Sequence, residues 1–117
     1  MDDTPDLYKL LNIPPYGTFK FNDMLQYDWG AELIFECSYE QEHGQDTVRF
    51  RIQAKDCRDM RWRIYAHARS DEDQDMPIAT LINLRLGQDR HRKPLHLLTD
   101  FFGLSVAYGE LLIYRLE

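Results

Sequence analysis

The chain has 117 residues, of which 44% are hydrophobic, 13% aromatic and 29% charged, and its formal net charge is −6. A chain of roughly 100–150 residues usually builds one hydrophobic core, so we expect one domain over residues 1–117 and exclude an arrangement of two domains. The net negative charge argues against a protein that coats nucleic acid or an anionic membrane, because such proteins usually carry net positive charge.

The beginning of the chain has neither the basic region nor the apolar region of a secretory signal. No apolar run approaches the length of about 18 residues that a membrane-spanning helix needs. We therefore expect a cytoplasmic protein with no membrane partner. In that reducing compartment, Cys37 and Cys57 are expected to be free thiols.

A short helix is predicted at the start of the chain. Residues 4–6 read Thr-Pro-Asp, which supplies an N-cap, a proline for the first helical position and an acidic side chain near the positive end of the helix dipole. Leu7, Leu10 and Leu11 would line its apolar stripe, and the two prolines at 14–15 would end it. We expect this helix to pack as a lid on the rest of the fold.

Apolar and polar residues then alternate between residues 18 and 69, and a period of two indicates β-strands. The predicted strands cover residues 18–21, 32–40, 47–54 and 60–69. Turn-rich links at residues 42–45 and 56–59 predict hairpins between the last three strands, and therefore an antiparallel meander.

The two hairpins determine which polar side chains share a face. The first would place Glu40, Ser38 and Glu36 opposite Thr47, Arg49 and Arg51. The second would place Arg49 and Arg51 beside Arg63, Tyr65 and His67. Opposite charges across strands contribute about 0.2–1 kcal/mol per pair, and the two glutamates can neutralise only part of this arginine cluster.

In the second half of the chain, an acidic exposed loop is predicted over residues 70–76, a strand over 78–86 and a polar loop over 87–94. A short helix capped by Thr99 and a final strand over 110–116 would follow. The fold class is α+β, mainly β: a curved antiparallel meander sheet, a small barrel or half-barrel, with a short N-terminal helix and a short helix near residues 96–104. An open sheet could pair with a second copy and form a homo-oligomer.

The charges are segregated along the chain. Residues 47–69 carry a net charge of +5, whereas residues 1–46 carry −8 and residues 70–84 carry −4. Arginines beside a tyrosine can grip carboxylates or phosphates in a bidentate manner and stack on a planar group. The predicted anion-facing patch consists of Arg49, Arg51, Arg61, Arg63, Tyr65, His67, Arg90, Arg92 and Lys93.

This segregation predicts a small non-enzymatic binding or adaptor domain that presents an arginine-rich sheet face to an acidic protein surface or a small anion. Nucleic acid is not the expected partner of a chain with this net charge. A simpler interpretation stays open: the arginines could form exposed ion pairs with neighbouring carboxylates and bind no partner, since such pairs are common and contribute little.

A carrier is the alternative function. A curved sheet could enclose a small apolar or aromatic ligand among Phe35, Phe50, Trp62 and Ile82. A fully packed interior with no cavity of ligand size would exclude this alternative.

An enzyme is the third interpretation, with His67 or His96 acting beside a carboxylate. No spacing in the chain enforces a catalytic geometry, so no catalytic residue is assigned. Cys57, which precedes Arg58 in a predicted turn, is a candidate reactive thiol.

No metal or cofactor is predicted. Asp71, Asp73 and Asp75 have the spacing that begins an EF-hand calcium loop, but Met76 and Ile82 stand where that loop needs glycine and glutamate. The histidines and cysteines lack the spacing of a zinc site.

Overall fold

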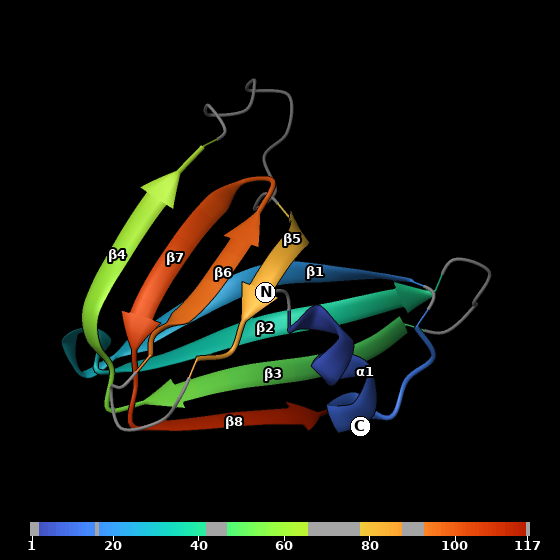
Figure 1. Ribbon diagram of the computed structural model, residues 1–117, viewed down its shortest axis with the longest axis horizontal. Coiled ribbons are helices and arrows are strands. Elements are labelled where there is room, and N and C mark those ends of the chain that lie inside the picture. The colour runs from blue at the N-terminus through green and yellow to red at the C-terminus, as the bar shows by residue number, and fades with distance from the viewer. Residues whose placement is uncertain (1–2, 16, 42–46, 66–77, 88–92, 117) are drawn as a thin grey trace.

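The computed structural model describes residues 3–15, 17–41, 47–65, 78–87 and 93–116, which contain one α-helix, one short 3-10 helix and eight strands (Figure 1). Strands account for 68% of the described residues and helices for 12%, which confirms a mainly β fold. The elements in chain order are α1 (Thr4–Leu11), β1 (Gly17–Tyr27), the short 3-10 helix η1 (Asp28–Gly30), β2 (Glu32–Gln41), β3 (Thr47–Lys55), β4 (Arg58–Ile64), β5 (Ala79–Arg85), β6 (Leu95–Thr99), β7 (Phe102–Ala107) and β8 (Glu110–Arg115).

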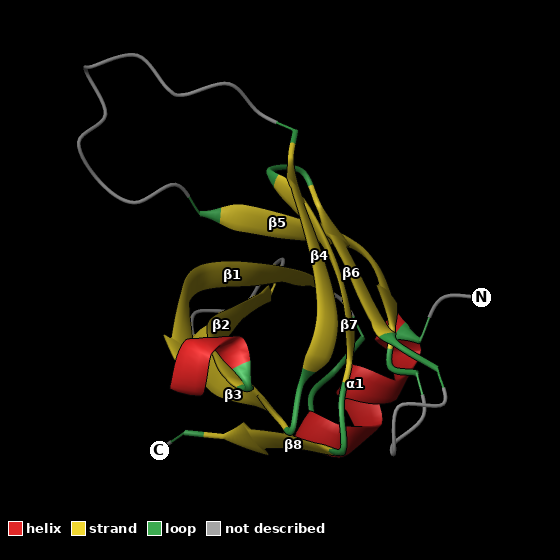
Figure 2. Cartoon of the chain, turned by 90° about the vertical axis from the view of Figure 1, so that its left-hand side faces the viewer, coloured by secondary structure: helices red, strands yellow, loops and turns green. Residues whose placement is uncertain are grey.

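Helix α1 confirms the predicted helix and most of its apolar stripe. Leu7 and Leu11 are fully buried, whereas Leu10 is 56% exposed. Asp3 rather than Thr4 occupies the N-cap position, and the left-handed backbone of Asn12 ends the helix. The helix packs against β5 and β8 at one end of the curled sheet (Figure 2). It is too short to cross a membrane, and the described residues contain no other helix long and apolar enough to do so.

Strands β1, β2 and β3 form an antiparallel meander. The β2–β3 hairpin has the predicted register, with Glu40 opposite Thr47 and Glu36 opposite Arg51. Strand β1 is longer than predicted and pairs with β2 along its length, except for a bulge between Phe21 and Asp23. Alternation places aromatic residues of all three strands on the inner face, where burial stabilises the pairing.

The predicted hairpin between β3 and β4 is wrong. Strand β3 pairs with β8, and β4 pairs with β7. The chain turns a corner at Asp56 and Cys57, where the Cys57 N–H donates to the Ala31 carbonyl at 2.8 Å and the Gly109 N–H donates to the Lys55 carbonyl at 2.9 Å. The first bond ties this corner to the turn before β2, and the second ties it to the corner between β7 and β8. The pair β3–β8 therefore continues into the pair β4–β7 of the other layer (Figure 1).

The predicted helix near residues 96–104 is also wrong, because these residues form β6, a tight turn and β7. The buried Thr99 hydroxyl accepts hydrogen bonds from the backbone N–H groups of Phe101 and Phe102 and donates to the Phe102 carbonyl. A residue with helix-capping chemistry therefore closes a hairpin. The strands predicted near 78–86 and 110–116 are confirmed as β5 and β8.

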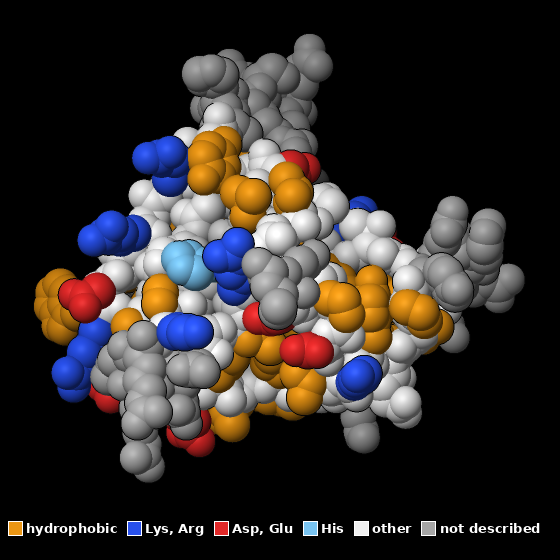
Figure 3. All heavy atoms as spheres, viewed as in Figure 1, with side chains coloured by type: hydrophobic (Ala, Val, Ile, Leu, Met, Phe, Trp, Pro, Cys, Tyr) orange, Lys and Arg blue, Asp and Glu red, His pale blue; other side chains and the backbone are white. Residues whose placement is uncertain are grey.

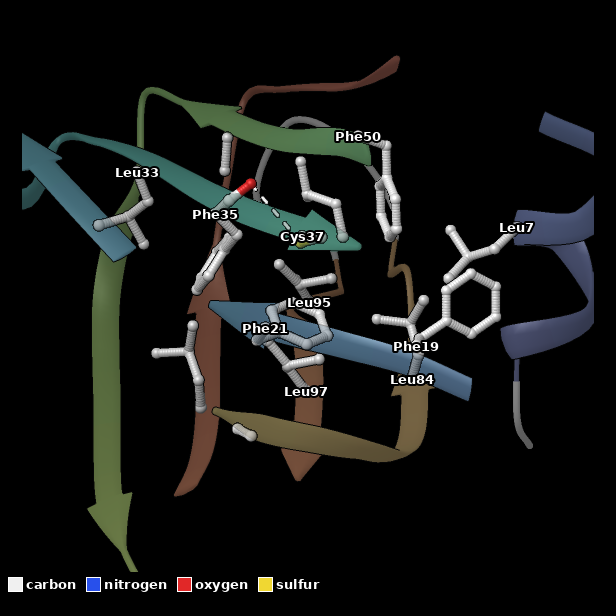
Figure 4. Packing of buried hydrophobic residues seen from close by; sticks show 14 of the residues in the cluster. Leu7, Phe19, Phe21, Leu33, Phe35, Cys37, Phe50, Leu84, Leu95 and Leu97 are labelled. Atoms are coloured by element: carbon white, nitrogen blue, oxygen red, sulfur yellow. Dashed lines mark hydrogen bonds between the residues drawn. The ribbon is translucent and has the colours of Figure 1, made fainter. Parts of the chain in front are cut away.

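The strands form one antiparallel sheet in the order β4-β7-β6-β5-β1-β2-β3-β8. The sheet curls without closing into a barrel. Figure 2 shows β4, β7 and β6 in one layer and β1, β2 and β3 in the other. The buried core lies between the two layers, where Phe35 and Cys37 of β2 meet Leu95 and Leu97 of β6 (Figure 4).

Candidate functional site

A row of polar side chains crosses the outer face of the layer formed by β4, β7, β6 and β5. Arg61 lies opposite Ser105, Ser105 opposite His96, and His96 opposite Arg85. Directly paired residues of a sheet point to the same side. The alternate residues Leu84, Leu97 and Leu104 are buried, so this row faces solvent.

A second row beside it is formed by Arg63, Gly103, Leu98 and Asn83. A Cβ atom at Gly103 would lie only 2.6 Å from the Tyr65 hydroxyl oxygen. The absence of a side chain at Gly103 therefore lets the tyrosine lie across the sheet, next to Arg61 and Arg63 of β4. The Tyr65 N–H donates to the Phe101 carbonyl at 2.8 Å, which holds its backbone at the end of β7.

These two rows surround a shallow depression of about 250 Å³. Its lining includes Arg61, Arg63, Tyr65 and His96, and the described residues that line it include no acidic one. We call Arg61, Arg63, Arg85, His96 and Tyr65 the basic face. Figure 3 shows this side of the molecule, with blue Arg and Lys side chains around the pale blue histidine. Guanidinium groups so placed can bind a carboxylate or phosphate, and the tyrosine ring can stack on a planar group.

The structure separates the predicted anion-facing patch into two parts. Arg49 and Arg51 lie on β3, on the outer face of the opposite layer. The Arg51 Nε atom donates to Glu36 Oε1 at 2.6 Å. Hydrogen bonds to Glu36 and then to Tyr114 raise the pKa of Arg51, so this guanidinium already has an anionic partner. Arg61, Arg63 and Tyr65 stay together on the basic face.

Three other members of the predicted patch, His67, Arg90 and Arg92, lie outside the described residues, and Lys93 is exposed next to β6. Arg85 and His96 belong to the basic face but not to the predicted patch. A bulge between Leu81 and Asn83 sets which residues of β5 face outward, and alternation in the sequence does not reveal that bulge. His96 pairs with Arg85 of another strand, and the residues near either one in the sequence do not indicate this pairing.

The four residues proposed for an interior ligand pocket have three different environments. Phe35 and Trp62 line a real pocket, and Phe50 is fully buried in the core. Ile82 is 56% exposed because it is the extra residue in the β5 bulge. The bulge moves the buried positions of β5 to Ala79 and Leu84, which breaks the alternation that had placed Ile82 inside.

That pocket has a volume of about 210 Å³ and lies between the two layers where β1 extends past β5. We call it the aromatic pocket; its lining residues are Phe21, Asn22, Asp23, Met24, Phe35, Trp62, Ala79, Phe101 and Phe102. Phe21 meets Phe35 and Phe102 edge to face, with centroid distances of 5.8 and 6.3 Å. Trp62 stacks on Phe102 at 4.6 Å.

Neither thiol is activated. Both cysteines are free, and burial raises the pKa of Cys37 well above its ordinary value. Partial burial, together with the nearby Asp56 and Glu32 carboxylates, raises the pKa of Cys57 to about 11, which makes it a poor nucleophile at neutral pH. Within the described segments, His, Cys, Asp and Glu side chains form no group of three that could hold a metal ion.

Searches among protein-family models, curated proteins and solved structures find no match for the chain.

Proposed function

We propose that this protein is a non-enzymatic binding module whose basic face receives carboxylate groups of an acidic protein surface or a small anion. The observation that carries the proposal is the cross-strand row of Arg61, Ser105, His96 and Arg85, which holds two arginines and no acid. Arg63 and Tyr65 extend the same face around a depression of about 250 Å³.

The contrast between the two layers supports this proposal. On the outer face of β3, Arg51 contacts Glu36 at 2.6 Å and is already neutralised. The structure gives no salt bridge between Arg61, Arg63 or Arg85 and any described carboxylate. Arginine charges without a nearby acid are available to an incoming anion, and a complementary acidic surface accelerates encounter as well as binding.

The test is a titration of the purified protein with hexaglutamate and, separately, with citrate, over a series of salt concentrations. We expect saturable binding that weakens as salt rises, because the contacts are exposed charge pairs. The double variant Arg61→Glu and Arg63→Glu should weaken binding about tenfold or more, since each lost or reversed exposed pair is worth up to about 1 kcal/mol. Binding of citrate as well as peptide would assign a small-anion site, whereas binding of peptide alone would assign a protein surface.

Arg49→Glu is the matched control, because Arg49 is an exposed arginine on the outer face of the opposite layer. It changes the net charge in the same direction without touching the basic face. Equal weakening by a charge reversal at Arg49 and a single reversal at Arg63 would show a general effect of net charge and would contradict the proposal. Circular dichroism of each variant checks that the sheet is intact.

A further inference from the structure

The aromatic pocket is lined by residues of five strands, and it shares only Trp62 with the described lining of the depression on the basic face. Phe21 comes from β1, Phe35 from β2, Phe102 from β7 and Trp62 from β4. Their ring contacts form a continuous series, from Phe35 through Phe21 and Phe102 to Trp62. Trp62 ends the series and keeps 40% of its surface exposed.

The volume of the pocket limits the size of a ligand. An apolar cavity of about 150 Å³ holds benzene, which has six heavy atoms. The aromatic pocket, at about 210 Å³, is roughly 1.4 times larger and has room for about eight or nine heavy atoms. That is the size of one phenyl ring with a chain of two or three atoms.

The charge at the mouth selects among ligands of this size. Among the described residues that line the pocket, Asp23 is the only ionisable one, and it is exposed. Its Oδ1 atom accepts the Met24 N–H at 2.8 Å, and the described residues provide no salt-bridge partner for it. The β1 bulge between Phe21 and Asp23 lies where β1 extends past β5, and the exposed Asp23 lines the rim of the pocket there.

We infer that the aromatic pocket binds a primary arylalkylamine, with the ring among Phe21, Phe35 and Phe102 and the ammonium group between Asp23 and Trp62. A cation is attracted both by a carboxylate and by the face of an indole ring. An anionic ligand of the same size would meet repulsion from Asp23 and would find no basic residue among the described residues of the lining.

The experiment uses three ligands of nearly equal shape: 2-phenylethylamine, 2-phenylethanol and phenylacetate. The chain has two tryptophans, so Trp29→Phe leaves Trp62 as the fluorescent reporter inside the pocket. Trp29 is fully exposed and lies outside the pocket lining. We expect saturable quenching or enhancement by the amine, a dissociation constant about two- to fivefold larger for the alcohol, and the weakest binding for phenylacetate.

Asp23→Asn should weaken binding of the amine about two- to fivefold and leave that of the alcohol unchanged, because only the amine carries the charge. Asp28→Asn, which removes an exposed carboxylate outside the pocket lining, is the matched control and should change neither. The inference is overturned by the absence of saturable binding, by equal affinity for phenylacetate, or by equal weakening in the two variants. The ligand series on the Trp29→Phe protein decides the matter even if Asp23→Asn does not fold.

Discussion

Trp62 of β4 stacks on Phe102 of β7, with ring centroids 4.6 Å apart and ring planes inclined by 17°. Trp62 points inward from an edge strand whose alternate residues, Arg61 and Arg63, point outward. The stack therefore anchors the strand that carries part of the basic face, and it forms one wall of the aromatic pocket.

Trp62→Ala should lower the free energy of unfolding by about 2 kcal/mol. Truncating a fully buried tryptophan or phenylalanine to alanine costs about 3–5 kcal/mol. Trp62 is 40% exposed, so its truncation should cost less. Trp29→Ala removes a fully exposed ring and should change the stability by less than about 0.5 kcal/mol. Urea titration measures both. Equal effects of the two substitutions would contradict an anchoring role for Trp62.

Gly103→Ala should displace Tyr65, because the new methyl carbon would lie 2.6 Å from the tyrosine hydroxyl. We expect a loss of stability of about 1 kcal/mol, since the far end of the tyrosine can move aside. In a Tyr65→Ala background the same substitution should cost close to nothing. This double-mutant cycle isolates the contact, and a cost at Gly103 that is the same in both backgrounds would show that Tyr65 does not lie over the glycine.

Thr99→Val should destabilise the protein by about 2–3 kcal/mol. The substitution keeps the shape of the buried side chain but leaves the N–H groups of Phe101 and Phe102 without the oxygen that accepts their hydrogen bonds. Thr99→Ser keeps the hydroxyl and should lose only about 1 kcal/mol, from the missing methyl group. Thermal unfolding compares the two, and a serine variant less stable than the valine variant would refute this account of the turn.

The Cys57 thiol should react with iodoacetamide at pH 8 about 100-fold more slowly in the folded protein than in urea, because its pKa rises from 9.0 to about 11. Peptide mapping by mass spectrometry separates Cys57 from Cys37. The unfolded thiol ionises first, so the contribution of this group to stability is complete below pH 9 and is lost as the pH rises to about 11. Equal reaction rates in the folded and unfolded protein would disprove the raised pKa.

The sequence predicts the local part of this fold well. The register of Glu36 with Arg51 follows from strict alternation on both sides of a short loop, so neighbouring residues contain the whole signal. The corner at Asp56 and Cys57 resembles a hairpin turn in composition. The chain does not form a hairpin there because the Lys55 carbonyl accepts a hydrogen bond from the N–H of Gly109, a residue far along the chain.

The candidate site is only partly predictable for the same reason. Arg61 and Arg63 alternate with Trp62, which indicates an arginine face on β4. Their grouping with Arg49 fails because β3 and β4 belong to different layers, and their grouping with Arg85 depends on the β5 bulge. A bulge adds one residue and reverses the alternation, and no residue type in β5 marks its position.

The measurement that tests the basic face most directly is a titration of isotope-labelled protein with hexaglutamate, followed by amide chemical shifts. The account predicts that the largest shifts occur at Arg61, Arg63, Gly103, Ser105, His96 and Arg85, which come together only through the pairing of β4, β7, β6 and β5. They should diminish together as salt is added. Largest shifts on the outer face of β3, at Arg49 and Arg51, or no saturable shifts at low salt, would contradict it.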